Sequence, residues 1–395
     1  MSRSIRLLTI THYFATHGGG IEIVAARLTE QFSLRDIQID WIASDVDLPR
    51  SVDAYIHYIP MSCWNVVEQK IGIPFPVWSL GAFKKVVGLV RTADLVIVHD
   101  ILYLPNIWGM LCAICLKRPF VIIQHVGLVP FRSAFLRGLM SLGNRTVGRF
   151  LMHKAAAVVF ISKTVRDYFA SVSGGNTAHW RLIPNGVDLE RFVPSCPAEE
   201  VSETYPDGKD YLYRFLFVGR FVEKKGLALL RRLAEAMPAV QWVFIGMGPL
   251  DPAQWGLKNV RVIGLLEQSA LPDWYRQCDL LVLPSCGEGF PLVVQEAMAC
   301  GLPVAISSET AEGLPGVRDI VFHAPVTGEV GDAEVWHRLL SNLLADDVLQ
   351  RRRSGVAEFV KQNWSWERSA EQYLALFEDI LKRPIREKSR QAEEI

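Results

Sequence analysis

The sequence predicts an α/β protein with two doubly wound parallel sheets, one in each half of the chain. Short apolar runs rich in β-branched residues alternate with helical patterns, which indicates βαβ units. The chain has 395 residues, half of them hydrophobic, which is long for a single domain. Residues 1–190 carry 19 basic and 13 acidic side chains and the remainder 23 and 29, although the whole chain is neutral. Halves of opposite sign indicate two domains with different partners.

The order of the predicted strands places a domain boundary near the middle of the chain. In the first half the strands are "RLLTITHYF", "IDWIAS", "DLVIVHD", "PFVIIQH" and "AAVVFIS"; in the second they are "RFLFVGR", "QWVFIG", "VRVIG", "DLLVLPS" and "PVAIS". The polar, proline-rich stretch "IPNGVDLERFVPSCPAEE" lies between them and is typical of an interdomain connection. We therefore predict a first domain over 1–188, a second over 189–363, and a C-terminal helix with its tail over 364–395.

Cysteine usage and hydropathy favour a reducing, cytoplasmic setting. The seven cysteines are scattered and odd in number, and the Cys112–Cys115 pair lies in an apolar stretch that favours buried structural thiols. The start "MSRSIRLLTI" lacks a signal-peptide pattern. The longest uncharged apolar stretch, Ile101–Leu116, is shorter than the roughly 20 residues that span a bilayer. We expect a cytoplasmic chain, and peripheral attachment to the inner face of the cytoplasmic membrane stays open.

Two glutamates stand out in "PSCGEGFPLVVQEAMACGLPVA", residues 284–305. Glu288 is predicted in a strand-to-helix turn, and Glu296 in a helix whose first residue is Pro291 and which ends at Gly301. Apolar neighbours predict burial, and a buried charge needs a partner. The stretch has no lysine, arginine or histidine. Carboxylates are double acceptors suited to vicinal diols, such as those of a sugar or ribose.

A basic pair follows another predicted strand, in "FVGRFVEKKGL" at 217–227. The strand ends at Gly219, and Arg220 and Lys225 come before the next helical pattern, with Lys224 expected to be a solvated neighbour. By itself such a basic pair is more often ordinary surface charge, although cations in a loop of this kind also bind phosphate oxygens.

Two weaker signals lie in the first half. "HGGGIE" at 17–22 allows close backbone approach to an anion at a helix N-terminus, although Ile23 occupies the place of the last glycine in a dinucleotide-binding fingerprint. "VIIQHVG" ends a strand with His125, where a histidine is more often structural than functional. His99 and Asp100 end the preceding strand and are the second-choice candidates for a functional residue at a strand end.

These motifs, in this order, resemble those of the retaining GT-B glycosyltransferases of family 4, the group 1 type, over nearly the whole chain. The match comprises the glycine triplet, the strand that ends at His125, G-R-x4-K-G at Gly219–Gly226, and E-G-F-P within E-x7-E at Glu288–Glu296. The resemblance implies two Rossmann-like domains facing an interdomain cleft, with the C-terminal helix crossing back to the N-terminal domain. It implies transfer of a sugar from a nucleotide-diphosphate donor to a hydroxyl acceptor, with retention of configuration.

The resemblance also assigns roles to residues. Glu288 would contact the transferred sugar, Glu296 the ribose, and Arg220 and Lys225 the diphosphate, with His125 next to the donor sugar. Ligand hydroxyls, and not protein cations, would then pair both glutamates. The catalytic set it implies is His125, Arg220, Lys225 and Glu288; the donor-binding set is Gly18, Gly19, Gly20, Gly219, Gly264, Gly289, Phe290, Pro291, Leu292 and Glu296. The donor would be a UDP- or GDP-sugar, with no cofactor and no metal. The stretch after Gly301 departs from the family pattern, because the usual glycine-rich loop is missing.

The acceptor side leaves alternatives open. Residues 131–154 alternate apolar residues with Arg132, Arg137, Arg145, Arg149 and Lys154, a pattern that fits an anionic membrane surface or an ordinary amphipathic helix packed on its own sheet. Trp64 and Trp78 would line an acceptor pocket or fill space, and the "DVD" at Asp45–Asp47 is predicted to be solvated. A lipid-linked or polysaccharide precursor of cell-envelope, lipopolysaccharide or exopolysaccharide synthesis is the expected acceptor. A non-catalytic sugar-nucleotide-binding subunit and a GT-B epimerase are the rival functions.

Overall fold

The computed structural model describes residues 4–49, 55–66, 68, 75–127, 134–174, 177–194, 211–345, 347–382 and 384–385. The chain folds into two compact units. The first comprises Met1–Asn185 and Trp366–Ile395, and the second comprises Gly186–Ser365. The chain passes from one unit to the other between the asparagine and the glycine of "IPNGVD", a dipeptide that favours a turn.

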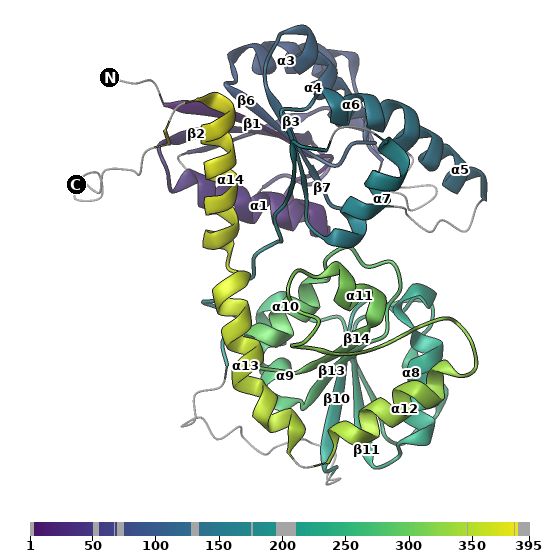
Figure 1. The fold of residues 1–395 in the computed structure, drawn as a ribbon. Helices are drawn as coiled ribbons and strands as arrows, with labels where there is room; N and C mark the ends of the chain where they lie inside the picture. The colour runs from purple at the N-terminus through teal and green to yellow at the C-terminus, as the bar shows by residue number, and fades with distance from the viewer. Residues whose placement is uncertain are drawn as a thin grey trace. The chain divides into compact units, whose positions relative to one another are not determined.

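The first unit is built on a seven-stranded parallel sheet (Figure 1). Its order is β3 (Ile56–Met61), β2 (Ile37–Ser44), β1 (Ile5–Ile10), β6 (Leu95–His99), β7 (Phe120–Gln124), β8 (Ala157–Phe160) and β9 (Trp180–Leu182). The described helices are α1 (Gly20–Ser33), α3 (Leu80–Thr92), α4 (Leu104–Cys115), α5 (Ala134–Gly143), α6 (Arg149–Lys154), α7 (Lys163–Ser173) and α14 (Trp366–Leu381). The central strands β1, β6, β7 and β8 are almost wholly buried, because helices cover both faces of the sheet.

The second unit repeats this architecture with a six-stranded parallel sheet. Its order is β12 (Val260–Gly264), β11 (Val240–Ile245), β10 (Tyr213–Val218), β13 (Leu280–Leu283), β14 (Val304–Ser307) and β15 (Phe322–Ala324). Its helices are α8 (Leu227–Ala236), α9 (Leu271–Gln277), α10 (Leu292–Ala299), α11 (Ser308–Gly313), α12 (Asp332–Leu343) and α13 (Val348–Asn363). In both sheets the strand order reverses beside the first strand, which creates the switch point where doubly wound folds bind ligands.

The last helix, α14, belongs to the first unit although it follows the second along the chain. Phe377 on α14 is fully buried and packs edge-on against Phe32 of α1, with ring centroids 5.3 Å apart. Tyr373 contacts the same ring at 6.1 Å, and Ser369 donates a hydrogen bond to the carbonyl of Pro184. Aromatic packing therefore fixes α14 on α1.

Several sequence-based expectations need correction. Pro291 lies at the N-cap of α10 and not at its first helical position, although the helix stops as expected, with Gly301 just beyond it at φ +76°. Trp78 is buried and donates to Ser44 Oγ, so it fills the core, whereas Trp64 is exposed. Cys112 is buried as expected but Cys115 is exposed.

Five strands escaped prediction: β3, β9 and β15 of the two parallel sheets, and the two-residue strands β4 (Cys63–Trp64) and β5 (Val77–Trp78), which pair with each other. The first three lie at the edges of their sheets, where half-exposed side chains weaken the apolar signal, and β3 also contains Pro60.

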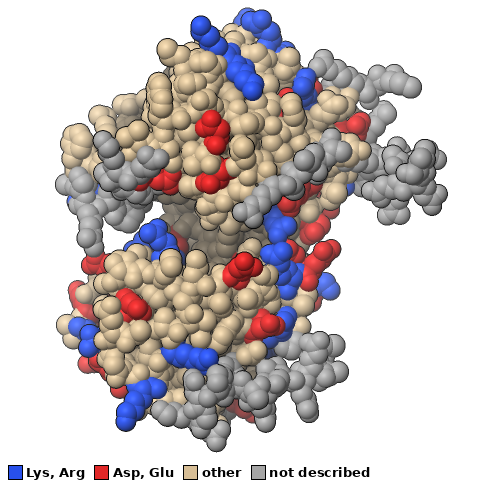
Figure 2. Space-filling view, turned by 180° about the vertical axis from the view of Figure 1, so that it is seen from behind, with Lys and Arg blue, Asp and Glu red and all other residues tan. Residues whose placement is uncertain are grey.

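The charge asymmetry between the two halves does not produce single-sign surfaces on the face seen in Figure 2. Basic and acidic side chains both occur there on each unit. No helix in the described parts of the chain is long and apolar enough to cross a bilayer.

Candidate active site

In the second unit, the predicted cationic and acidic residues lie beyond the carboxyl ends of neighbouring strands. Gly219 and Arg220 follow β10, and Glu288 lies in the turn after β13, the strand that pairs with β10. Because carboxyl ends of parallel strands share one edge of the sheet, the two loops emerge side by side.

The two loops are joined by an ion pair that the sequence did not predict. Lys225 Nζ lies 2.7 Å from Glu288 Oε1, and their side chains are only 15% and 10% exposed. The expectation that no protein cation pairs with these glutamates is therefore wrong for Glu288. The cation comes from a loop 63 positions earlier in the chain and not from the stretch that surrounds the glutamate.

Gly226 explains why these loops can approach so closely. It adopts φ +75°, and a Cβ at this position would lie 2.4 Å from the carbonyl oxygen of Pro284. Only glycine allows both this conformation and this contact. The bond from Cys286 N–H to the Lys224 carbonyl, 2.9 Å, adds a second link between the loops.

Glu296 has neutral partners. The residue is only 5% exposed. Its carboxylate accepts hydrogen bonds from Gln268 Nε2 at 2.7 Å and from the Tyr275 hydroxyl at 3.0 Å. Burial raises the pKa of Glu296, and these two hydrogen bonds offset part of that effect. Two neutral side chains thus already pair with this carboxylate and fix its orientation.

The other predicted site residues of the second unit differ in their surroundings. Gly219 lies beside the Lys225 side chain, since a Cβ on it would be in ordinary van der Waals contact with Lys225 Cε, at 3.8 Å. Arg220 is exposed and forms no ion pair with any residue that the structure describes. Gly289 and Leu292 are partly exposed, and Gly264 ends β12 at φ +85° with open space beside it. The Phe290 side chain is directed into the core, where it packs against Trp364 at 5.3 Å, and Pro291 is buried beside it.

The segment after Gly301 lacks the family's glycine-rich loop but contacts the turn that carries Glu288. It forms β14 and α11, and Ser307 caps α11 while donating to the carbonyl of Ser285 at 2.6 Å. Glu309 on α11 accepts a hydrogen bond from Gly287 N–H at 3.4 Å. A glutamate therefore supports the turn that carries Glu288.

In the first unit, the glycine triplet forms the turn between β1 and α1. Gly18 adopts φ +80°, Gly19 is the N-cap of α1, and Gly20 is its first residue. The Glu22 carboxylate folds back over Gly19, where a Cβ would lie 2.1 Å from Glu22 Oε2. Glu22 also pairs with His12 at 2.8 Å, and both side chains are almost completely buried. Glu22 on α1 therefore contacts the glycine turn and fixes its position.

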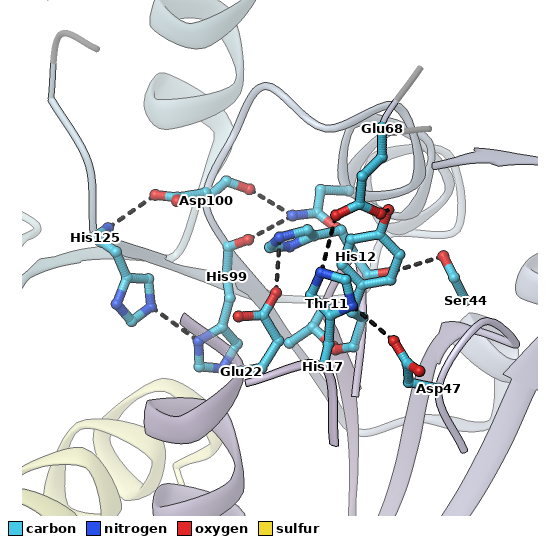
Figure 3. Close-up of polar contacts among 12 residues, drawn as sticks. Thr11, His12, His17, Glu22, Ser44, Asp47, Glu68, His99, Asp100 and His125 are labelled. Carbon is cyan, nitrogen blue, oxygen red and sulfur yellow. Dashed lines mark hydrogen bonds and ion pairs between the residues drawn. The ribbon is translucent and has the colours of Figure 1, made fainter. Parts of the chain in front are cut away.

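His125 lies one residue beyond β7, beside the end of β6 (Figure 3). His125 Nε2 is 2.9 Å from His99 Nδ1, a contact that two neutral imidazoles satisfy with one proton between them. Burial lowers the pKa of His125 to about 3 and that of His99 well below its ordinary value. Asp100 fixes this pair by accepting from the backbone N–H of His125 at 2.8 Å. The two second-choice residues are thus the immediate partners of His125.

A second cluster of polar side chains surrounds His17, on the N-terminal side of the glycine turn. It was not predicted from the sequence. His17 Nδ1 is 2.7 Å from Asp47 Oδ2, and His17 Nε2 is 3.1 Å from Glu68 Oε1. The Asp45–Asp47 loop lies at the surface as predicted, but Asp47 binds His17 and Asp45 accepts from Cys63 N–H. Burial alone would raise the pKa of Glu68, but hydrogen bonds from Asn65 and Tyr13 and the charge of His17 lower it below its ordinary value. His17 itself stands in the "HGGGIE" motif, which was the available sequence signal.

Comparisons with known proteins agree with this architecture. Residues 18–191 match the family model described as Glycosyltransferase Family 4, and residues 213–346 match Glycosyl transferases group 1. The chain is 27% identical over 311 residues to D-inositol 3-phosphate glycosyltransferase of Xylanimonas cellulosilytica, covering 73% of this chain and 72% of that one. It is 29% identical over 310 residues to GDP-mannose-dependent alpha-mannosyltransferase of Mycolicibacterium smegmatis, covering 76% of each.

A solved structure shows the same fold. HepE of Anabaena in complex with UDP-glucose superposes with a TM-score of 0.66 at 17% identity, over 95% of this chain and all of that chain. Two doubly wound units are the architecture of the GT-B fold, and the family models and relatives identify the chain as a glycosyltransferase. The chain belongs to the family 4, group 1 glycosyltransferases.

Proposed function

We propose that this glycosyltransferase moves a hexosyl group from a nucleoside-diphosphate sugar to a hydroxyl acceptor, with retention of configuration. The observation that carries the proposal is the Lys225–Glu288 ion pair at the shared edge of β10 and β13, with Arg220 beside it. A lysine ammonium has three N–H donors, so the contact with Glu288 leaves donors for a phosphate oxygen. The same lysine then orients the carboxylate that accepts sugar hydroxyls and stabilises the departing diphosphate.

Each of the remaining site residues has a part in this proposal. Arg220 supplies an exposed guanidinium for a second phosphate contact. Glu296, oriented by Gln268 and Tyr275, accepts from the ribose hydroxyls. The glycine turn at 18–20 offers backbone N–H groups to the donor phosphates, and neutral His125 offers a hydrogen bond to the donor sugar.

The relatives indicate more than one candidate for the base and the sugar of the donor. One relative is named for GDP-mannose, and one structural neighbour holds UDP-glucose. The proposal needs no metal, because two protein cations are available for the diphosphate. A thermal-shift screen of UDP- and GDP-sugars, with and without EDTA, identifies the donor, since a ligand that binds the folded state raises its apparent stability. A donor that binds only when a divalent ion is added would contradict the metal-independent part.

For the acceptor we propose an anionic, lipid-linked or polysaccharide precursor at an anionic membrane surface. The support is the face of α5 and α6, joined by the π-helical turn Asn144–Gly148. Phe135, Leu139 and Leu142 are spaced at i, i+4 and i+7, and they are 75%, 55% and 59% exposed. Exposed basic residues lie on either side of Leu139 and Leu142, namely Arg137 before them and Arg145, Arg149 and Lys154 after them; Arg132 lies outside the described residues.

Such an apolar stripe between basic residues is what an interfacial helix needs. The ordinary alternative, a helix packed on its own sheet, would bury this stripe. Flotation with neutral and with anionic vesicles tests the proposal: recovery only with anionic vesicles supports it, and equal recovery or none contradicts it. Loss of flotation in the Leu139→Glu variant, with unchanged release of nucleoside diphosphate from the donor, would locate the surface.

The rival of a non-catalytic binding subunit has its own test. The enzyme releases nucleoside diphosphate when donor and acceptor are both present, and the NMR signal of the new anomeric proton reports retention or inversion. Donor binding without any release would favour the binding subunit.

A further inference from the structure

The turn that leads into the glycine triplet is fastened by a histidine with two acidic partners. The 3-10 turn η1 (Ala15–His17) ends at Gly18, whose N–H returns to the Ala15 carbonyl at 3.0 Å. Figure 3 shows His17 between Asp47 and Glu68, which come from two different segments, a loop and a helical residue. The residue that immediately precedes the glycines is therefore tied to both segments.

Both ring nitrogens of His17 face hydrogen-bond acceptors. Each ring nitrogen faces a carboxylate oxygen, at 2.7 Å and 3.1 Å. An ionised carboxylate only accepts hydrogen bonds, so both contacts are satisfied only when both nitrogens carry a proton. The Tyr13 ring stacks on the imidazole at 3.9 Å, and its hydroxyl donates to Glu68 at 2.7 Å. A ring held on two edges and one face has a single orientation.

The turn has a further link to Asp47. Thr16 Oγ1 donates to the Asp47 carbonyl at 2.8 Å, so two successive residues bind the same aspartate. On the other side of the glycines, buried Glu22 binds His12. The glycine turn therefore has fixed flanks on both sides, although its own backbone needs conformations that only glycine adopts freely.

We propose that His17 is a positioning residue: as an imidazolium shared by Asp47 and Glu68, it fixes the entrance to Gly18–Gly20 and thereby sets the affinity of that turn for the donor diphosphate. The proposal rests on the proposed function, in which this turn binds phosphate. Removing His17 acts in two ways on that affinity. The turn loses its fixed geometry, and two carboxylates lose their cation beside an anion site.

The three side chains are partly exposed, at 21% for His17, 42% for Asp47 and 24% for Glu68. Partly exposed ion pairs contribute little to global stability. Variants of His17 should therefore fold, with melting temperatures close to that of the wild type.

The test is the dissociation constant of UDP and of GDP, measured by calorimetry on the full chain. His17→Ala should weaken binding of the preferred nucleoside diphosphate about tenfold. His17→Gln, which keeps one N–H₂ donor for one carboxylate, should show a smaller loss. With saturating donor sugar, kcat should stay within about twofold of the wild type, because the change removes binding that the ground state and transition state share.

His57→Ala is the matched control. His57 also pairs with an aspartate, Asp40, at 3.1 Å, but it lies on β3 away from the glycine turn. This variant should bind nucleoside diphosphate as the wild type does. If His17→Ala binds as tightly as the wild type, or if only kcat falls, the inference is wrong. If the alanine variant does not fold, the glutamine variant decides in the same way. A wild-type chain that binds neither UDP nor GDP would instead refute the proposed function.

Discussion

Lys225 Nζ and Glu288 Oε1 lie 2.7 Å apart, although the two residues come from different βα loops of the second unit. The contact depends on the adjacency of β10 and β13 and on the absence of a side chain at Gly226. This ion pair thus connects Lys225, the residue expected at the diphosphate, with Glu288, the residue expected at the transferred sugar. Mutations can test the backbone that allows this contact as well as the two charges.

The first prediction concerns Gly226. Gly226→Ala places a Cβ 2.4 Å from the Pro284 carbonyl oxygen in a left-handed conformation, so the loop has to move away from Glu288. We expect a loss of at least about tenfold in kcat/KM for donor, because even a displacement of about 1 Å disturbs a catalytic geometry.

Gly256→Ala is the control for the backbone term. Gly256 has φ +70° but open space around it, so this variant carries the conformational cost of about 1 kcal/mol without the collision. Its kcat/KM should match the wild type. Equal activity of the two alanine variants would show that the approach of the loops is unimportant.

The second prediction concerns Asp100. Burial raises the pKa of Asp100 to about 7, from 3.8 in the unfolded chain, and hydrogen bonds from His125 and Val126 offset only part of this. The folded state therefore holds a proton that the unfolded state has lost between pH 4 and 7. The stability that this group contributes is present at low pH and is lost as the pH rises through 7.

Asp100→Asn keeps the acceptor and suits the φ of +66°, but it cannot ionise. Relative to the wild type, the variant should gain about 2 kcal/mol in the free energy of unfolding between pH 5 and pH 8. Denaturant unfolding at the two pH values measures this change. His99 and His125 titrate in both proteins and cancel in the comparison. A difference that does not vary with pH would show that Asp100 is ionised throughout.

The third prediction concerns α14. Phe377 is fully buried against Phe32, so Phe377→Ala should destabilise the first unit by about 3–5 kcal/mol. Asp379→Ala on the same helix, which removes an exposed pair with Lys382, should leave the unfolding midpoint unchanged. Equal midpoints for wild type and Phe377→Ala would mean that α14 does not stabilise this unit.

The repeating architecture could be read from the sequence because buried parallel strands are continuous apolar runs. Each of the ten predicted strands overlaps a strand of the structure, from β1 to β14. The edge strands β3, β9 and β15 were missed because their burial patterns are mixed and β9 and β15 have only 3 residues each. The edge strand β12 was found because its 5 residues, VRVIG, are rich in β-branched side chains.

The site was less predictable than the fold because its contacts join residues distant in sequence. The residue types of Arg220, Lys225, Glu288 and Glu296 carry chemistry, so they could be selected by motif. Their partners could not: Tyr275 and Gln268 reach Glu296 from 21 and 28 positions away. His17 was visible in its motif, but the carboxylates that bind it lie 30 and 51 positions further along.

The measurement that tests the central claim most directly is the rate of nucleoside diphosphate release from the preferred donor in Lys225→Ala and Glu288→Gln. Both variants should fold and should lose at least about 100-fold in kcat, because one removes the cation at the diphosphate and the other the carboxylate that it orients. Arg231→Ala, which breaks an exposed Arg231–Glu235 pair on α8, is the control and should release product at the wild-type rate. A wild-type rate in either Lys225→Ala or Glu288→Gln would contradict the account.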